Sequence, residues 1–163
     1  MVEIRETKSD DLDFVLEHEY SAAAVPYIAV WTREQHLDAI ASPAVDHLMI
    51  TADGEPAGYA IYLDLDHAYG SLQLKRIVVS RRGEGIGRAA LELIVERGFS
   101  AHGAHRVWLD MVTSNGAARR VYESLGFVEE GVLREVWRND EGRQSLAVMS
   151  ILDREWEQRR NPD

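Results

Sequence analysis

Chemistry is first suggested by a glycine turn in the middle of the chain, Arg82-Gly83-Glu84-Gly85-Ile86-Gly87-Arg88. It directly follows the apolar run Ile77-Val78-Val79 and precedes residues with the apolar spacing of a helix. The first turn of a helix has unpaired N–H groups with a partial positive charge, and glycines let an anion approach them. Arg82 and Arg88 add the possibility of charge-assisted contacts to phosphate oxygens. The turn therefore predicts a phosphate-binding site built largely from main chain.

Two familiar phosphate loops do not fit this turn. The nucleoside-triphosphate loop ends in Gly-Lys-Ser or Gly-Lys-Thr, whereas Gly87 is followed by Arg88-Ala89. The dinucleotide fingerprint is Gly-x-Gly-x-x-Gly, whereas the glycines here stand at 83, 85 and 87. The remaining pattern is Arg-x-x-Gly-x-Gly, carried by Arg82, Gly85 and Gly87. A strand-to-helix turn without a ligand also has this pattern, so the choice depends on the rest of the chain.

Composition narrows the class of protein. The 163 residues are 45% hydrophobic and 28% charged, which is typical of a single globular domain spanning residues 1–163. A formal net charge of −10 argues against nucleic acid as a partner, because phosphate binding needs a basic face. The same charge favours solubility or attraction of a cationic substrate. Segment 75–88 is locally basic against this background, which suits an anionic ligand.

Several kinds of site are excluded or disfavoured. The chain has no cysteine, so disulfides, thiolate metal sites and a cysteine nucleophile are excluded. Its six histidines lack the spacing of a metal-ligand motif, and we expect no metal. The N-terminus is charged, and no apolar stretch approaches the length of roughly 18 residues needed to span a membrane. We therefore expect a cytoplasmic protein without a membrane partner.

The glycine turn belongs to a mixed α+β pattern. Asp53-Gly54 predicts a tight hairpin, and the near-continuous apolar run at 77–79 predicts a strand end that is buried on both faces. A strand, a helix and a strand from 72 to 112 predict a parallel crossover. We expect strands at 2–5, 47–51, 57–63, 72–80, 106–112, 127–137 and 144–151, and helices at 12–19, 33–40, 86–101 and 116–125.

A second pattern stands at a fixed distance after the turn. It reads Asn115-x-x-Ala118-x-x-x-Tyr122-Glu123-x-x-Gly126-Phe127. Together with Arg82-x-x-Gly85-x-Gly87 and the strand order, it resembles the GNAT family of N-acetyltransferases. The resemblance covers most of the chain and is strongest from 72 to 131; residues 122–131 are similar to bacterial ribosomal-protein and spermidine N-acetyltransferases. It implies the acyl-CoA N-acyltransferase fold, a central, mostly antiparallel mixed sheet flanked by helices.

The resemblance also implies a reaction and its cofactor. An acetyl group would pass from acetyl-CoA to a primary amine by direct attack in a ternary complex. The amides from Arg82 to Arg88 would hold the CoA diphosphate, and the main chain of Ile77, Val78 and Val79 would pair with the pantetheine arm. Asn115 matches the family asparagine that contacts CoA, and it is also a plausible helix cap.

Tyr122 and Asp110 are the candidate catalytic residues. Tyr122 matches the family tyrosine that protonates the departing thiolate, and a free phenol with a pKa near ~10 can share a proton with a thiol. Its alternative role is packing on an apolar helix face. Asp110 matches the glutamate base of ribosomal-protein-type relatives, and a structural aspartate is its alternative. Glu130, Asp64 and Asp66 are weaker candidates for the base.

The acceptor side is less defined by the sequence. We expect aromatic residues to build it, with Tyr27 and Trp31 as substrate-binding residues and with Tyr62 and Trp137 nearby. The acceptor would be a small-molecule amine, a polyamine or a protein N-terminus. Family relatives are often homodimers, and the sequence does not decide the oligomeric state. A non-catalytic module that senses acyl-CoA is the alternative function.

Overall fold

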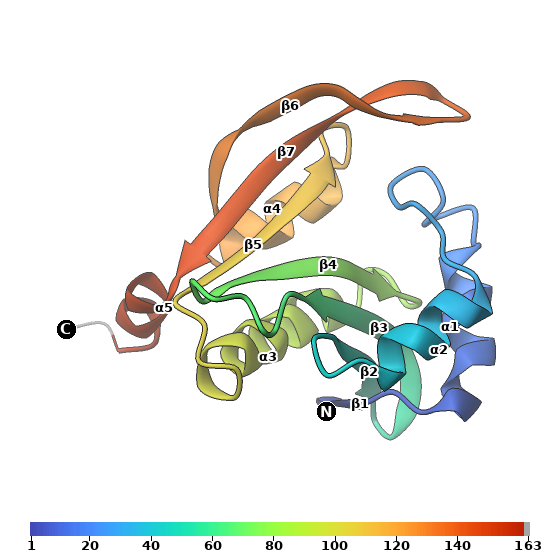
Figure 1. Ribbon diagram of the computed structural model, residues 1–163, viewed down its shortest axis with the longest axis horizontal. Helices are drawn as coiled ribbons and strands as arrows, with labels where there is room; N and C mark the ends of the chain where they lie inside the picture. Colours follow the sequence, from blue (N-terminus) through green and yellow to red (C-terminus); the bar gives the residue numbers. More distant parts are fainter. Residues whose placement is uncertain (162–163) are drawn as a thin grey trace.

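The computed structural model describes residues 1–161 of the chain. A seven-stranded sheet with the order β1-β2-β3-β4-β5-β7-β6 forms its centre, and helices pack on both faces (Figure 1). The strands are β1 (Val2–Glu6), β2 (Asp46–Ala52), β3 (Glu55–Leu63), β4 (Ser71–Val79), β5 (Arg106–Val112), β6 (Val128–Asn139) and β7 (Gly142–Leu152). The helices are α1 (Leu12–Glu19), α2 (Arg33–Ala41), α3 (Ile86–Ser100), α4 (Gly116–Ser124) and α5 (Asp153–Arg160), and a 3-10 turn, η1 (Ser9–Asp11), precedes α1.

The predicted fold class is confirmed. β4 and β5 are parallel, and the other neighbouring strands of the described chain are antiparallel. The hairpin predicted at Asp53-Gly54 is present, and both residues have a positive φ, 54° and 83°. A type I′ turn requires such angles. The strands expected at 127–137 and 144–151 pair as a long hairpin, in which β6 and β7 meet at Asn139 and Gly142.

β4 and β5 are neighbours over only a short distance. Their register joins Ser71–Gln73 to Arg106–Trp108, and the two strands then diverge (Figure 1). β5 continues along β7, whereas β4 continues along β3. Within residues 1–161, the β4 edge from 74 to 79 therefore has no strand partner on the β5 side. Its main-chain groups are left for another hydrogen-bonding partner.

A β-bulge in β4 changes which way the side chains of this strand point. Lys75 is the extra residue, because Arg76 pairs with Ile61 while Leu74 pairs with the next β3 residue, Tyr62. Leu74 lies in the core beneath α3, whereas Arg76 points to the opposite face and contacts α1. Without the bulge, two residues at this spacing would share one face.

The predicted burial of Ile77-Val78-Val79 on both faces is wrong. All three residues are half-buried. The reason is that this end of β4 borders a cavity instead of being covered by a helix on each side.

Two apolar clusters hold the helices on the sheet. On one face α3 packs over β3, β4 and β5 through its buried residues, which are Ile86, Ala90, Leu91, Ile94, Val95 and Gly98. On the other face α1 packs through Leu12 and Val15 against Met49, Tyr59 and Ile61. Burial of this much apolar area is the main favourable contribution to folding.

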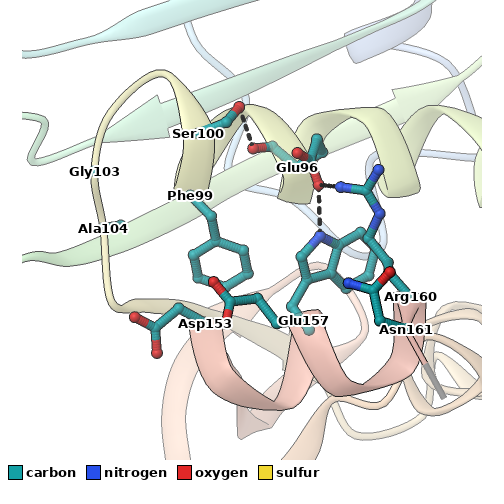
Figure 2. A pocket seen from close by; sticks show the side chains of 10 residues that line it. Glu96, Phe99, Ser100, Gly103, Ala104, Asp153, Glu157, Arg160 and Asn161 are labelled. Carbon is teal, nitrogen blue, oxygen red and sulfur yellow. Dashed lines mark hydrogen bonds and ion pairs between the residues drawn. The ribbon is translucent and has the colours of Figure 1, made fainter. Parts of the chain in front are cut away.

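The C-terminal helix α5 was not predicted. Trp156 is its one buried residue in the described chain, so the segment lacks the apolar stripe that marks a helix in a sequence. The Trp156 Nε1 donates to Glu96 of α3 at 2.7 Å, and Arg160 pairs with the same carboxylate (Figure 2). An open cavity of about 550 Å³ lies along this seam between α3 and α5.

Candidate active site

The splayed strands border a cavity of about 920 Å³. Its walls come from five parts of the chain: the end of β4, the loop into α3, the end of β5, α4, and the segment between α1 and α2. The β6–β7 hairpin adds Val136, Trp137 and Leu146. This cavity joins the two sequence patterns that lie about thirty residues apart.

The glycine turn forms one end of the cavity. Gly83 and Gly85 have φ angles of 81° and 75°, and Gly85 is the N-cap of α3. A Cβ atom built on either glycine would meet no atom within 4 Å, so backbone conformation and not crowding requires glycine there. The first amides of α3 thus face outward beside a left-handed turn, a geometry suited to an anion.

The flanking arginines differ in their partners. Arg82 lines the cavity and donates to Ala23 O at 3.0 Å, while Arg88 donates to the Ser124 hydroxyl at 2.6 Å. Ile86 and Gly87 also line the cavity. Glu84 does not: it is exposed and faces Arg81, with 3.8 Å between Nε and Oε2.

The open edge of β4 lies beside this turn. Ile77, Val78 and Val79 line the cavity, and their main chain is unpaired toward β5 within the described residues. An arm that carries amide groups fits such an edge, because it restores the missing hydrogen bonds as a further strand would. The edge and the turn together fit a ligand with a diphosphate at one end and amides along its length.

Asn115 and Tyr122 lie on α4 across from the turn. The Asn115 side chain accepts from Ala118 N at 3.2 Å, which confirms its role as N-cap, and it also lines the cavity. Tyr122 lines the cavity and packs on Phe127, with 5.6 Å between ring centroids. Burial, together with the negative charge of Asp110, raises the pKa of Tyr122 to about 12. The phenol is therefore protonated at neutral pH.

Asp110 is half-buried on β5 and lines the cavity. The other carboxylates that the sequence suggested lie elsewhere: Glu130 accepts from Ser150 and Arg106 at 2.6 and 2.7 Å, and it does not line the cavity. Asp64 and Asp66 do not line it either. Of the described cavity-lining residues, Asp110 is thus the one with a carboxylate.

The aromatic residues expected on the acceptor side divide into two groups. Tyr27 and Trp137 line the cavity. The expectation for Tyr62 is wrong, because its side chain is fully buried in the core and donates to Ile94 O at 3.0 Å. Trp31 lies behind the cavity wall, where its ring stacks under the Arg76 guanidinium at 4.9 Å.

A buried polar network behind this wall was missed by the sequence analysis. Glu19 of α1 is fully buried and accepts from Arg76, from Trp31 N at 2.6 Å and from Tyr59 at 2.9 Å. It also bonds His36 at 2.5 Å. Burial works to raise the pKa of Glu19, but the bond with His36 and the charge of Arg76 hold it below the ordinary value. The available signal was a glutamate at an apolar position of a helix.

The network continues away from the cavity. His36 Nδ1 lies 3.0 Å from His47 Nε2, and His47 Nδ1 lies 2.8 Å from the Thr7 hydroxyl. Burial, together with the neighbouring His36, lowers the pKa of His47 to about 4. Within residues 1–161 no group of three or more His, Asp or Glu side chains is arranged to hold a metal, and no helix is long and apolar enough to cross a bilayer.

Comparison with known families decides the class of this site. The sequence model of the Acetyltransferase (GNAT) family matches residues 12–127, which include α1, the glycine turn and α4. The chain belongs to the GNAT family. As a GNAT acetyltransferase it uses acetyl-CoA to acetylate an amine.

Two GNAT relatives illustrate the range of acceptors. The ribosomal protein bS18-alanine N-acetyltransferase of Escherichia coli is 32% identical over 108 residues, which cover 64% of this chain and 70% of that protein. The spermidine N(1)-acetyltransferase of Vibrio cholerae is 26% identical over 96 residues, which cover 58% of this chain and 56% of that protein.

Solved structures show the same GNAT fold. The Vibrio cholerae spermidine N-acetyltransferase, in complex with CoA and spermine, has a TM-score of 0.86 and 20% identity, covering 96% of this chain and 98% of that one. The Escherichia coli ribosomal-protein-alanine N-acetyltransferase has a TM-score of 0.77 and 26% identity, covering 93% and 94%. The first of these likenesses concerns the fold alone, since the identity is low.

Proposed function

We propose that this GNAT acetyltransferase acetylates the α-amine of a protein N-terminus. The charge of the cavity carries the proposal. Asp110 is the one carboxylate among the described lining residues, whereas the lining includes five basic residues, Lys75, Arg76, Arg81, Arg82 and Arg88. An acceptor with one ammonium group matches one carboxylate, and an acceptor with several does not.

Most of the basic lining residues are assigned to other partners, but this does not make the cavity suited to a polycationic acceptor. Arg76 is paired with Glu19, and Arg81, Arg82 and Arg88 flank the turn proposed for the CoA diphosphate. The remaining charged lining residues are Asp110 and Lys75. A polyamine would bring further ammonium groups into the cavity. These groups would lose their hydration and find no carboxylate to pair with, and an unpaired buried charge is strongly unfavourable.

On the donor side, we assign most of the acetyl-CoA contacts to main-chain groups of the protein. The amides from Arg82 to Arg88 hold the diphosphate, Arg82 and Arg88 supply charge, and Asn115 contacts the cofactor beside its own cap. The open edge of Ile77–Val79 pairs with the pantetheine amides. A main-chain amide near Val78 polarises the thioester carbonyl, where negative charge develops in acyl transfer.

On the acceptor side we assign two proton transfers. Asp110 takes a proton from the acceptor ammonium, directly or through one water, so that the free amine attacks the thioester carbon. The bond from carbon to sulfur breaks as the bond from carbon to nitrogen forms. Tyr122 donates its proton to the departing thiolate, and the phenolate is re-protonated from solvent. The pKa of about 12 keeps Tyr122 in the donor form before transfer.

The wall that receives the acceptor is proposed to include Tyr27, with Trp31 supporting it from behind. Support for a protein acceptor comes from the Escherichia coli relative, which acts on alanine of a ribosomal protein. The spermidine enzymes are the competing precedent. Their acceptor conflicts with the single carboxylate of this cavity.

An acceptor panel tests the proposal. Thiol release from acetyl-CoA is measured with peptides that have a free N-terminal alanine, the same peptides with a blocked N-terminus, and spermidine. We expect release with the free peptides and little with the others. Preferred acetylation of spermidine would contradict the proposed acceptor. CoA binding without release from any amine would instead favour an acyl-CoA sensor.

We further propose that the enzyme works as a homodimer in the cytoplasm, where ribosomal proteins are made, and binds no nucleic acid. β6 supports the dimer: it is one of the two edge strands of the described sheet, it is twelve residues long, and it exposes Val128, Val132, Leu133 and Val136. A long apolar edge is a ready site for pairing with another chain. Light scattering after gel filtration tests the dimer, and a salt-dependent RNA titration tests the nucleic-acid claim.

A further inference from the structure

The segment between α1 and α2, residues 21–31, is the wall of the cavity opposite Asp110's strand. It contributes Tyr27, Ile28 and Ala29 to the lining, and it contains no helix or strand. Its own turn-forming main-chain hydrogen bonds end at Tyr27, which donates to Ala24 O at 2.8 Å. The last part of the wall, from Ile28 onward, therefore depends on side chains from other elements for its hydrogen bonds.

Two buried side chains supply bonds to this part of the wall, and the exposed Tyr20 hydroxyl adds one to Trp31 O at 3.1 Å. Arg76 of β4 donates from Nη2 to Ala29 O at 2.5 Å, and Glu19 of α1 accepts from Trp31 N at 2.6 Å. Arg76 and Glu19 also pair with each other through Nη1 and Oε1. Glu19 is 0% exposed and Arg76 is 4% exposed, so water does not compete for these contacts.

We propose that Glu19 and Arg76 are positioning residues that set the acceptor wall at 28–31 and so determine how tightly the acceptor binds. The inference rests on the proposed function in one respect: it assumes that the acceptor amine binds beside residues 28–31. Neither residue touches the reacting atoms. They act through the main chain of Ala29 and Trp31.

The side-chain chemistry of Arg76 and Glu19 suits them to hold the main chain of residues 28–31. Arginine presents several donors in a rigid fork, and here two arms of the fork reach Glu19 and Ala29 O at the same time. Lysine has a single compact ammonium that cannot reproduce both contacts. Glu19 accepts four hydrogen bonds, from Arg76, Trp31, Tyr59 and His36. Glutamine at position 19 would turn its side-chain NH₂ group, itself a donor, toward some of the donors that now bond the carboxylate.

The test compares Glu19→Gln and Arg76→Lys with a matched control, Tyr59→Phe. The control removes another hydrogen bond to the same carboxylate, at 2.9 Å, but the Tyr59 hydroxyl makes no hydrogen bond to residues 28–31. We measure KM for an N-terminal peptide and KM for acetyl-CoA in the full-length protein. Loss of one charge-assisted bond corresponds to roughly ten- to a hundredfold in binding.

We expect both test variants to raise KM for the peptide by about tenfold or more, with KM for acetyl-CoA within about twofold of wild type. Tyr59→Phe should leave both values near wild type. A parallel rise of both KM values, or an equal effect of Tyr59→Phe, would show a general structural role and overturn the inference.

Hydrogen exchange separates this inference from the proposed acceptor. In Glu19→Gln and Arg76→Lys, the Trp31 amide, which donates to Glu19, should exchange faster than in wild type, while the amides of α3 should not. If the wild-type enzyme fails to acetylate any peptide, the proposed acceptor is wrong, but faster exchange of the Trp31 amide with unchanged exchange in α3 still supports the positioning role. Unchanged exchange in both variants would refute it.

Discussion

Replacing Tyr122 with phenylalanine tests the proton donor of the proposed mechanism. The change removes one oxygen from a half-buried ring that packs on Phe127, so the fold should be retained. Tyr122 and Asp110 both line the cavity, and the charge of Asp110 contributes to the raised pKa of Tyr122. The reaction should then lack a group that protonates the departing thiolate.

The size of the effect follows from the state of the phenol. A pKa of about 12 means that the ionised fraction at pH 8 is about 1 in 10,000, compared with about 1 in 100 for a free phenol. Tyr122 is therefore a proton donor throughout the pH range in which a thiol with a pKa near ~8.5 leaves. General acid catalysis typically contributes about 10²- to 10⁴-fold, so kcat should fall by that factor.

The assay is thiol release at saturating acetyl-CoA and peptide, with Tyr69→Phe as the matched control. Tyr69 is 80% exposed and lies outside the cavity lining, so its variant should keep wild-type kcat. Asp110→Asn should lower the pKa of Tyr122, because it removes a neighbouring negative charge. A kcat of Tyr122→Phe within about threefold of wild type, well below the usual contribution of a general acid, would refute the donor role.

Two further predictions concern the glycine turn and the buried histidine. Gly85→Ala should lower the free energy of unfolding by about 1–2 kcal/mol, because residue 85 has a φ of 75° at the N-cap of α3. It should also raise KM for acetyl-CoA but not KM for the peptide. Thermal unfolding measures the first effect and titration with acetyl-CoA the second, and an unchanged KM for acetyl-CoA would count against the turn as the diphosphate site. His47 is neutral in the fold and has a pKa of about 4, so the unfolded chain takes up its proton first as the pH falls. Stability should therefore decline between about pH 6.5 and pH 4, by up to about 3 kcal/mol, and urea unfolding of His47→Gln should show a flatter profile in that window; equal slopes for the two proteins would contradict this assignment.

Much of the donor side could be predicted from the sequence because its signals are local. The positive φ angles at Gly83 and Gly85 and the cap at Asn115 follow from residue types at particular positions. The parallel pairing of β4 and β5 follows from the crossover between them. These features need no knowledge of distant contacts.

The acceptor side could not be predicted in the same way, because tertiary contacts decide it. The bulge at Lys75 has no glycine or proline to mark it, yet it turns Arg76 away from the face of Leu74 and toward α1. Aromatic type alone did not separate Tyr62, a core residue, from Tyr27, a cavity residue. Glu19 at an apolar helical position was a usable signal, since a carboxylate is seldom buried without partners.

The most direct test of the account is a competition between acceptors in one reaction. The enzyme is given acetyl-CoA with equal concentrations of an N-terminal alanine peptide and spermidine, and both acetylated products are quantified by mass spectrometry. The single carboxylate of the cavity predicts that acetyl-peptide is the main product. Acetyl-spermidine as the main product, or no acetylation of the peptide, would contradict the central claim.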